Sequence, residues 1–322
     1  MRLIAPMLAT PGEPPEDMDG WAAEMKYDGC RVLAAAGGGQ RPVLWTRNLN
    51  VVTSSYPEVT EALAEVFGGH RRIVFDGEIV ALSQGRPSFA RLQRRMNTLR
   101  PTTTLRRQVP VTYLPFDVLT ADGEDLMAAP YVDRRAALTD LGHDLRGAIQ
   151  VLPHWEGIGS AVILDAARNS MMEGALFKRV SSLYTPGQRS RLWRKVLLRN
   201  RSSAVVVGWV PGGRAERNMV GALVLGAYDE AGVLRYVGQV GTGFSMAVRR
   251  QLKEKLALLE RRTSPLGTDA AAAEEHGIVR WVEPVVVVDV AYREYLPGGL
   301  RHPSFKGQRG DLDPGSITRD SL

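Results

Sequence analysis

The sequence predicts an α+β fold in two domains, and three features predict it. Short apolar runs typical of strands alternate with amphipathic helices through the first 200 residues. Beyond residue 200, five or so short strands separated by glycine turns accompany one helix within about 120 residues. A chain of 322 residues is long enough for two or three cores. We therefore expect a mixed domain at residues 1–200 and a small β-barrel at residues 201–322.

The first domain begins with a Pro-rich lead-in, residues 1–20, that we expect to cross its surface. Apolar runs indicate strands that start at Trp21 and at residues 32, 43, 71, 110 and 173. Apolar residues at helical spacing indicate helices at residues 56–69, 87–96, 131–142 and 161–169. The basic, turn-rich segment 181–200 is the expected hinge to the second domain.

Glycines set the expected turns of this domain. The Asp28-Gly29 pair predicts a hairpin between the first two strands. The glycines of segment 37–42 lack the GxxxxGK[ST] pattern of a phosphate cradle, so we expect another hairpin connection there. Gly77 lies inside a strand and predicts a bulge or a close backbone approach.

In the second domain we expect strands at residues 204–210, 221–228, 233–244 and 284–295, and a helix at 246–261. The OB fold is the nucleic-acid-binding barrel of this size. The tail, residues 300–311, is rich in Gly, Pro and charge, and we expect it outside the core.

Composition limits the classes of function. The net charge of +6 and the pI near 9.6 suit a polyanionic partner, although Arg-rich proteins that bind nothing share these values. A single cysteine, Cys30, excludes an internal disulfide and fits a reducing cytoplasm. The sequence shows no signal peptide and no apolar run of membrane-spanning length, so we expect an intracellular, soluble protein.

Lys26 is the residue around which the chemistry is expected. A Lys beside an Asp-Gly turn is usually a solvated turn residue. However, only six of the 41 basic residues are Lys, and the others are Arg. Attack by a neutral amine is one task that Lys performs and Arg does not.

The chain resembles the ATP-dependent DNA ligases, most closely the compact bacterial ligases of the ligase C and ligase D type. The likeness rests on segments in the order of the family's motifs: EMKYDGCR (24–31, motif I), WTRN (45–48), VFDGEIV (74–80, motif III), PFDVL (115–119, motif IIIa), EGALFK (173–178, motif IV), LWRK (192–195, motif V), and VGTGF (240–244) with RHPSFKGQRGD (301–311, motif VI). The resemblance implies a nucleotidyltransferase (adenylation) domain of antiparallel sheets flanked by helices, followed by an OB-fold barrel.

The resemblance also implies a three-step reaction. The Lys26 amine attacks the α-phosphorus of ATP and forms a lysyl-AMP phosphoramidate, with release of pyrophosphate. The AMP then moves to the 5′-phosphate of a DNA nick, and the 3′-hydroxyl displaces it. The cofactors would be ATP and Mg²⁺ or Mn²⁺.

The resemblance assigns each motif residue a role. Asp28 would act in the later steps, Glu24 would mark the adenine edge, and Phe116 would stack on adenine. Further roles are sugar or phosphate binding by Arg31 and Arg47, neutralisation of phosphate charge by Lys178 and Lys195, metal binding by Glu173, and ribose or metal binding by Glu78. The alternatives are that both glutamates are exposed strand carboxylates and that Phe116 is ordinary core.

In the second domain the resemblance assigns pyrophosphate orientation to Arg301, Lys306, Arg309 and Asp311. The implied partners are nicked double-stranded DNA and, in double-strand-break or excision repair, Ku and a repair polymerase or primase. The protein would be a nucleoid-associated monomer.

Three positions depart from the family pattern. Leu197 and Leu312 stand where many ligases carry Lys, and Leu49 stands where Gly is common. The two missing lysines would slow adenylation unless Lys306 or a neighbouring Arg takes their place. The alternatives are another nucleotidyltransferase on this scaffold, an RNA ligase or a GTP-using capping enzyme, and an inactive nucleic-acid-binding homologue.

Overall fold

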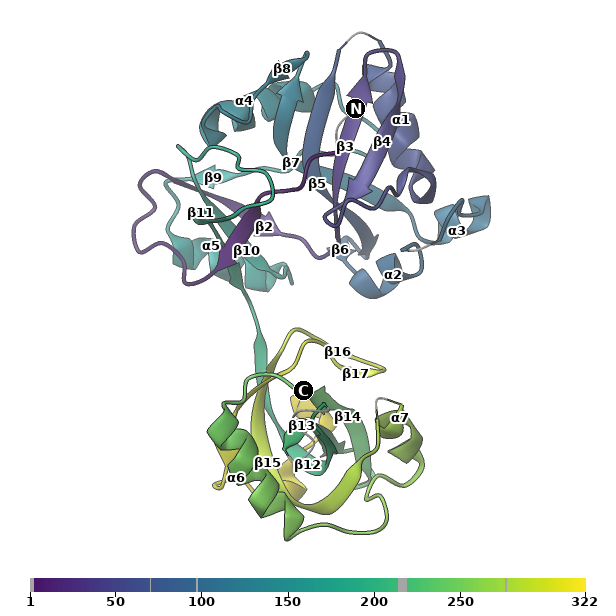
Figure 1. Ribbon diagram of the computed structural model, residues 1–322, viewed down its shortest axis with the longest axis vertical. Helices are drawn as coiled ribbons and strands as arrows, with labels where there is room; N and C mark the ends of the chain where they lie inside the picture. The colour runs from purple at the N-terminus through teal and green to yellow at the C-terminus, as the bar shows by residue number, and fades with distance from the viewer. Residues whose placement is uncertain (1–2, 70, 97, 214–218, 276) are drawn as a thin grey trace. The chain divides into compact units, whose positions relative to one another are not determined.

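A computed structural model describes residues 3–69, 71–96, 98–213, 219–275 and 277–322. The chain divides into two compact units, Met1–Leu198 and Arg199–Leu322 (Figure 1). Among the described residues, no helix is long and apolar enough to cross a membrane.

The first unit contains two sheets. The six-stranded sheet has the order β4-β3-β5-β7-β8, with β6 paired to β5, and its strands are β3 (Cys30–Gly37), β4 (Gln40–Thr46), β5 (Ile73–Ser83), β6 (Arg86–Pro87), β7 (Val111–Ala121) and β8 (Glu124–Asp125). The five-stranded sheet has the order β1-β11-β10-β2-β9, and its strands are β1 (Leu8–Pro11), β2 (Trp21–Lys26), β9 (Trp155–Glu156), β10 (Gly174–Arg179) and β11 (Arg189–Leu197).

Helices flank these sheets. Those of the first unit are α1 (Pro57–Phe67), α2 (Phe89–Gln93), α3 (Thr103–Gln108), α4 (Tyr131–Gly142) and α5 (Ser160–Asn169), with a 3-10 turn, η1 (Thr53–Ser55). Helices α1 and α4 cover one face of the six-stranded sheet, where Val59, Leu63 and Leu138 are buried. Helix α5 buries Ile163 against β2 and β10 of the other sheet.

The two sheets meet through a second apolar cluster. Leu33 and Trp45 come from the six-stranded sheet, and Trp193 comes from β11 of the other. The Trp45 indole N–H donates to the carbonyl of Ile4 (2.9 Å), which ties the lead-in to this cluster. The lead-in is therefore part of the fold, since β1 also pairs with β11.

The structure corrects two expectations in this unit. Strands β2 and β3 do not form a hairpin, because each belongs to a different sheet, and the Asp28-Gly29 turn carries the chain between them. The segment 181–200 is also not turn-rich throughout, because residues 189–197 form β11, paired with both β10 and β1, with Trp193 fully buried; the division between the two units falls just after β11, between Leu198 and Arg199. The expected break at Gly77 is confirmed: the pairing of β5 with β7 shifts at Asp76/Gly77, and a Cβ there would lie 2.6 Å from the Tyr113 ring.

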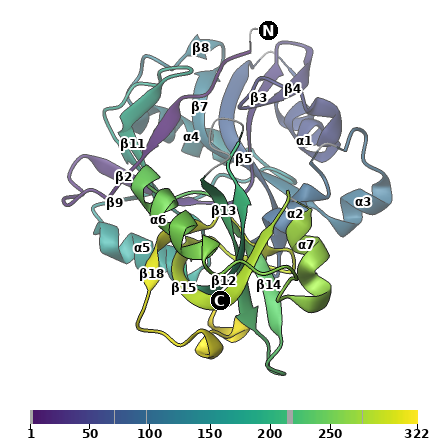
Figure 2. The ribbon, with the colours of Figure 1, turned by 60° about the horizontal axis from the view of Figure 1, so that its bottom comes forward.

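The second unit is a five-stranded antiparallel sheet of order β14-β13-β12-β15-β18 with a long, curved β15 (Figures 1 and 2). Its elements are β12 (Asn200–Pro211), β13 (Val220–Tyr228), β14 (Leu234–Val240), α6 (Met246–Ala257), η2 (Gly267–Asp269), α7 (Ala270–Glu274), β15 (Arg280–Tyr292), β16 (Tyr295–Leu296), β17 (Gly299–Leu300), β18 (Ser304–Arg309), η3 (Pro314–Ser316) and η4 (Arg319–Ser321).

The two outer strands of this sheet meet at one corner. Just after β14, the carbonyl of Thr242 accepts a hydrogen bond from the Phe305 amide of β18 (2.9 Å). The rings of Phe244 and Phe305 stack with centroids 4.5 Å apart. The sheet thus curls toward the closed barrel that its strand pattern predicts.

The tail was expected outside the core, and that expectation is wrong. It forms β18, and both Leu300 and Phe305 are buried. Leu312 also packs against the core of this unit, which gives a physical reason for an apolar side chain where the resemblance expects Lys.

Replacement of Arg134 by Met should destabilise the first unit by about 3–5 kcal/mol, because it leaves a carboxylate buried without its partner. Arg134 and Asp117 are both 0% exposed and share two hydrogen bonds, of 2.8 and 2.9 Å. Chemical denaturation measures the change in the free energy of unfolding. The control is Arg71→Met, which breaks an exposed pair with Asp122 and should cost about 0–1 kcal/mol. Equal losses in the two variants would contradict the prediction.

Candidate functional site

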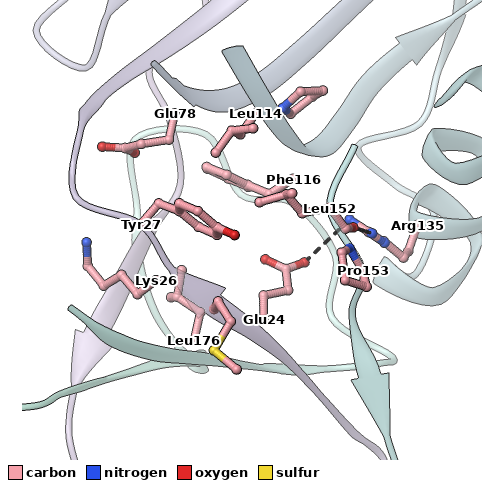
Figure 3. Close-up of a pocket in the computed structure, with 12 residues that line it drawn as sticks. Glu24, Lys26, Tyr27, Glu78, Leu114, Phe116, Arg135, Leu152, Pro153 and Leu176 are labelled. Atoms are coloured by element: carbon pink, nitrogen blue, oxygen red, sulfur yellow. Dashed lines mark hydrogen bonds and ion pairs between the residues drawn. The ribbon is translucent and has the colours of Figure 1, made fainter. Parts of the chain in front are cut away.

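Two adjoining cavities lie in the first unit, and they share four lining residues: Lys26, Glu78, Phe116 and Leu176. The smaller, of about 50 Å³, is a mostly apolar slot whose other walls are Glu24, Met25, Tyr27, Leu114, Pro115, Arg135, Leu152 and Pro153 (Figure 3). The larger, of about 610 Å³, is more polar and includes Arg31, Arg47, Arg189 and Lys195 in its lining. The apolar walls of the first are suited in chemistry to a flat ring, and the basic lining of the second is suited to phosphates.

Lys26 lies at the junction of the two cavities, at the end of β2. Its Nζ donates a hydrogen bond to Oε2 of Glu173, and both side chains are largely buried. Glu173 immediately precedes β10, and its backbone amide donates to the Lys26 carbonyl (3.1 Å). Pairing between β2 and β10 therefore holds the amine and the carboxylate together.

The turn after Lys26 packs closely against β5. A Cβ on Gly29 would lie 2.2 Å from the Ile79 carbonyl oxygen and 2.8 Å from Cγ of Glu78. Only glycine permits this approach. The approach brings Asp28, which is partly buried, and Lys26 close enough to act on the charge of Glu78.

The pKa of Glu78 is strongly altered by this arrangement. Burial raises its pKa to about 7, supported by the negative charges of Glu173 and Asp28 and opposed by Lys26 and Arg31. The carboxyl group therefore changes charge near neutral pH.

Glu24 closes one end of the slot. It is 5% exposed and accepts hydrogen bonds from Lys178 Nζ (2.9 Å) and from the Tyr131 hydroxyl (2.5 Å). Burial opposes its ionisation, but the nearby Lys178 and Arg135 hold the pKa of Glu24 below its usual range. Glu24 is thus a fixed buried carboxylate at the position where the sequence predicts the adenine edge.

Lys178 lies outside the linings of both cavities, contrary to the expected phosphate contact. It is fully buried, donates to Glu24 and to the Phe116 carbonyl (3.1 Å), and lies over the rings of Phe116 and Trp193 (4.7 and 4.4 Å to the centroids). Lys178 thus holds Glu24 and Phe116, two residues that line the slot, from the side away from the cavity linings.

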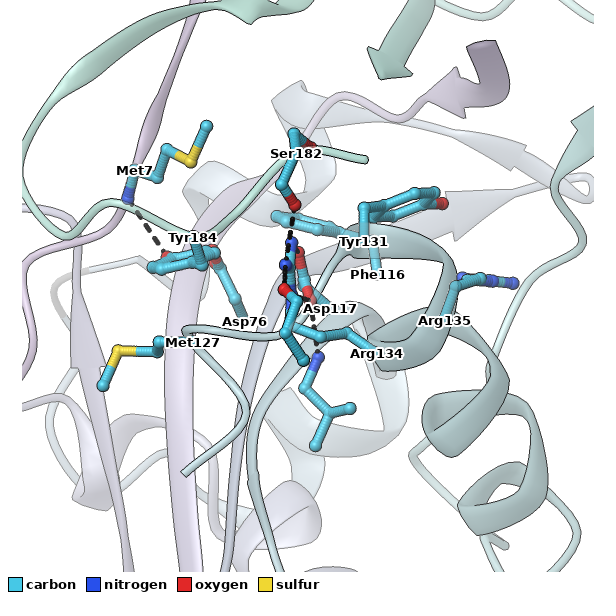
Figure 4. A network of polar contacts seen from close by, with 12 residues as sticks. Met7, Asp76, Phe116, Asp117, Met127, Tyr131, Arg134, Arg135, Ser182 and Tyr184 are labelled. Carbon is cyan, nitrogen blue, oxygen red and sulfur yellow. Dashed lines mark hydrogen bonds and ion pairs between the residues drawn. The ribbon is translucent and has the colours of Figure 1, made fainter. Parts of the chain in front are cut away.

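Phe116 lies between the cavities, partly exposed to both. The Arg31 guanidinium lies 5.3 Å from the centre of its ring and makes two hydrogen bonds with Asp76, of 3.0 and 2.6 Å. The Tyr184 hydroxyl donates to the same Asp76 (2.6 Å) and accepts from the Met7 amide (3.1 Å; Figure 4). These contacts fix Arg31 in the wall of the larger cavity.

Arg47 and Lys195 also line the larger cavity. Arg47 is exposed, whereas Lys195 is partly buried, and burial and then the charge of Lys26 lower the pKa of Lys195. Near Arg47, Leu49 has a φ of 63°, a left-handed conformation that favours glycine. A Gly, which the family pattern places at this position, would adopt this conformation without strain.

The four predicted residues of the second unit lie in or beside β18. Arg309 pairs with Asp311 (2.7 Å) and with Asp289 (3.3 Å). Arg301 pairs with Glu294 (2.8 Å), and Lys306 is exposed. They lie in a different unit from Lys26.

Tyr131, Arg135 and Asp76 contribute to the site but were not among the predicted residues. Tyr131 and Arg135 are four apart on α4, on the face that also carries Leu138. Polar residues at core positions of an amphipathic helix were the available signal. For Asp76 the sequence signal was weaker: it is a carboxylate within an otherwise apolar strand.

Two carboxylates of the site, Glu78 and Glu173, have the chemistry of metal ligands. Among the described residues, no group of three or more His, Cys, Asp or Glu side chains could hold a metal ion. Glu78, which lines both cavities, nevertheless lies close enough to Glu173 for the negative charge of Glu173 to raise the pKa of Glu78. Mg²⁺ is commonly held by one or two carboxylates together with substrate phosphates, so the pair fits that ion.

The raised pKa of Glu78 predicts a pH-dependent stability difference between the wild type and Glu78→Gln. The folded-state pKa is about 7 and the ordinary value is 4.5, so the folded protein binds the extra proton between these pH values. Glu78 therefore contributes most to stability below pH about 4.5 and loses that contribution as pH rises through about 7. Denaturation from pH 5 to 8 should show the wild type losing stability relative to Glu78→Gln. A difference that does not change with pH would contradict the assignment.

Comparison with known proteins gives consistent matches over the whole chain. The sequence profile of the ATP dependent DNA ligase domain matches residues 6–196, and that of the ATP dependent DNA ligase C terminal region matches residues 216–312. The multifunctional non-homologous end joining protein LigD of Mycolicibacterium smegmatis is 35% identical over 317 residues, which are 98% of this chain and 39% of that protein. LigD of Pseudomonas aeruginosa is 35% identical over 98% of this chain and 36% of its own length.

Solved structures agree with these matches. The mycobacterial DNA ligase D complexed with ATP and MES has 35% sequence identity, a TM-score of 0.57 and 98% coverage of both chains. The α+β nucleotidyltransferase fold with a C-terminal OB-type domain is thereby confirmed. The chain spans about two fifths of the length of the LigD proteins that it matches. It belongs to the family of ATP-dependent DNA ligases.

Proposed function

We propose that this chain seals nicks in double-stranded DNA that carry 3′-hydroxyl and 5′-phosphate ends, with ATP as the source of AMP. The observation that carries the proposal is the position of Lys26. Its amine lies where an apolar slot for a base meets a basic cavity for phosphates, and it is paired with Glu173. Membership of the ligase family supports the choice of reaction.

In the first step the Lys26 amine attacks the α-phosphorus of ATP. A nitrogen–phosphorus bond forms, and the bond from the α-phosphorus to the pyrophosphate oxygen breaks. The amine must be neutral to attack. Glu173, in contact with Nζ, is the group placed to accept the proton that the ammonium loses.

Glu173 and Glu78 would hold Mg²⁺ or Mn²⁺. Such an ion, when bound, neutralises phosphate charge and polarises the phosphoryl group. Glu78 is the ligand whose availability depends on pH, since its pKa is about 7. Protonation of Glu78 at low pH should therefore weaken metal binding.

The residues that line the two cavities indicate where the base, the ribose and the phosphates of ATP would bind. The base lies in the slot against Phe116, with Glu24 at its edge. The slot must widen to admit a purine, because a volume of about 50 Å³ holds only a few water molecules. Arg31, Arg47 and Lys195 face the ribose and phosphates, where charged donors stabilise the transferring group.

Later steps need DNA. Asp28, next to Lys26 and Glu78, is assigned to the transfer of AMP to the 5′-phosphate and to sealing. Arg301, Lys306, Arg309 and Asp311 would orient pyrophosphate, and the basic surface would bind the DNA backbone with a strong salt dependence. The non-homologous end joining names of the relatives support a role in double-strand-break repair. Ku and a repair polymerase are the partners that we propose for this role.

Lys26→Arg should abolish AMP attachment, because a guanidinium stays protonated and cannot attack. The measurement is intact mass after incubation with ATP and Mg²⁺, with GTP in parallel. The wild type should gain one AMP. The matched control is Lys253→Arg in α6, which should be labelled like the wild type. Labelling by GTP alone would indicate a capping-type enzyme, and an adduct on Lys26→Arg would refute the role of Lys26.

The same variant separates the nucleophile from the rest of the site. Lys26→Arg should fail on a nick with a 5′-phosphate yet still seal a nick whose 5′ end already carries AMP, because sealing requires no new lysyl-AMP. Gel separation of labelled DNA measures both reactions. Loss of sealing on both substrates, in a variant with wild-type stability, would contradict this division of roles.

Glu173→Gln should lower the rate of AMP attachment about tenfold or more and raise the Mg²⁺ concentration needed for half-maximal rate, since it removes a metal ligand and a proton acceptor. A Mg²⁺ titration of the initial rate measures both effects. The control is Glu65→Gln on the exposed side of α1. An unchanged Mg²⁺ requirement would remove Glu173 from the metal site.

A further inference from the structure

The slot ends in two opposite charges, Glu24 and Arg135. Arg135 comes from α4, is 4% exposed, and lines the slot together with Phe116 and Leu176. In Figure 3 its guanidinium points toward the Glu24 carboxylate across the end of the slot. A buried guanidinium in an otherwise apolar wall is costly unless its donors are used.

Two of the donors on Arg135 are used by the protein. Nε donates to Nδ1 of His154 (3.1 Å), and Nη2 donates to the carbonyl oxygen of Leu152. These contacts hold the plane of the guanidinium against the segment that follows α4. Because the guanidinium is planar and rigid, these two contacts also fix the direction in which Nη1 points.

His154 is itself held in place. Because Nδ1 accepts from Arg135, the neutral ring carries its proton on Nε2, which lies 3.4 Å from Oε1 of Glu156. Burial and the charge of Arg135 lower the pKa of His154, so the ring stays in this neutral form. Glu156, His154 and Arg135 thus form a chain of contacts that ends at the slot.

Nη1 of Arg135 lies 3.9 Å from Oε1 of Glu24. This separation is an ion pair but is too long for a hydrogen bond. A fixed donor and a fixed acceptor therefore lie side by side at the end of an apolar slot that has an aromatic wall. A planar heterocycle with a donor next to an acceptor on one edge complements this pair.

We infer that Arg135 is a specificity-determining residue, which donates from Nη1 to a ring nitrogen of adenine while Glu24 accepts from the adjacent exocyclic amine. His154 acts as the positioning residue for Arg135. Guanine would place its carbonyl oxygen against the Glu24 carboxylate, acceptor against acceptor, and is rejected. The inference rests on the proposed function, because it assigns the base of the ATP that Lys26 attacks.

The test uses ATP analogues that each lack one ring nitrogen, 1-deaza-ATP and 7-deaza-ATP. AMP attachment to the purified full chain is followed by intact mass as a single turnover, and the maximal rate constant of this step (written kcat) and the half-saturating concentration (written KM) are determined with each nucleotide. For the wild type, one of the two analogues should lower kcat/KM about tenfold or more, because it leaves a buried donor unpaired. In Arg135→Met, kcat/KM with ATP should fall by a similar factor, and that analogue should cause no further loss.

Controls keep the outcome decisive. Arg146→Gln, an exposed arginine just after α4, should discriminate like the wild type. His154→Phe should raise KM for ATP and reduce the discrimination, and it serves in place of Arg135→Met if that variant does not fold. Equal use of ATP and both analogues by the wild type would overturn the inference and leave the proposed function intact. A discrimination unchanged in Arg135→Met would also overturn it. Absence of any adduct with ATP on the wild type would instead refute the proposed function.

Discussion

The close approach of Gly29 to β5 is the constraint on which the site depends. At this glycine the chain passes from one sheet of the first unit to the other, and its backbone lies so near Ile79 and Glu78 that no side chain fits. Lys26 ends the strand before this crossing, and Arg31 belongs to the strand after it. The amine that we propose as the nucleophile, a basic cavity and two carboxylates are thereby brought together by the crossing of one short turn.

A set of buried polar contacts holds the two sheets at that crossing. Tyr184, close to β11, reaches Asp76 of the other sheet, and Asp76 in turn orients Arg31. Lys178 of β10 reaches Glu24 and the carbonyl of Phe116. Arg134 donates hydrogen bonds to Asp117 and to the Ser182 carbonyl (Figure 4). It therefore connects α4 to β7 of one sheet and to the segment between β10 and β11 of the other. Each contact costs desolvation and is compensated only when its partner is in place, which favours a single arrangement of the site.

Most of the helices and strands could be predicted from the sequence, because hydrophobic periodicity and turn residues depend only on neighbouring positions in the chain. The strands around the Asp28-Gly29 turn, helices α1 and α4, and the break at Gly77 follow from such patterns. Sheet membership could not be predicted in this way. Segment 24–31 looks like a hairpin, and only tertiary pairing shows that its two strands belong to different sheets. The strand β11 was also missed, because its Arg-rich sequence pairs along both edges without an apolar pattern.

The candidate site shows the same division. Lys26, Glu78, Phe116 and Glu173 could be proposed from motif resemblance, and the structure brings all four to one place. The burial of Lys178 and the exposure of Arg135 to the slot could not be deduced, because both depend on which helix face meets which strand. The left-handed backbone at Leu49 could not be predicted either, because leucine rarely adopts that conformation.

The most direct test of the account is a crystal structure of the protein after incubation with ATP and Mg²⁺. The account predicts continuous density from Nζ of Lys26 to the phosphorus of AMP, with the base in the slot beside Phe116 and its amine facing Glu24. A nucleotide bound elsewhere, or a base in the slot with its phosphates directed away from Lys26, would contradict it.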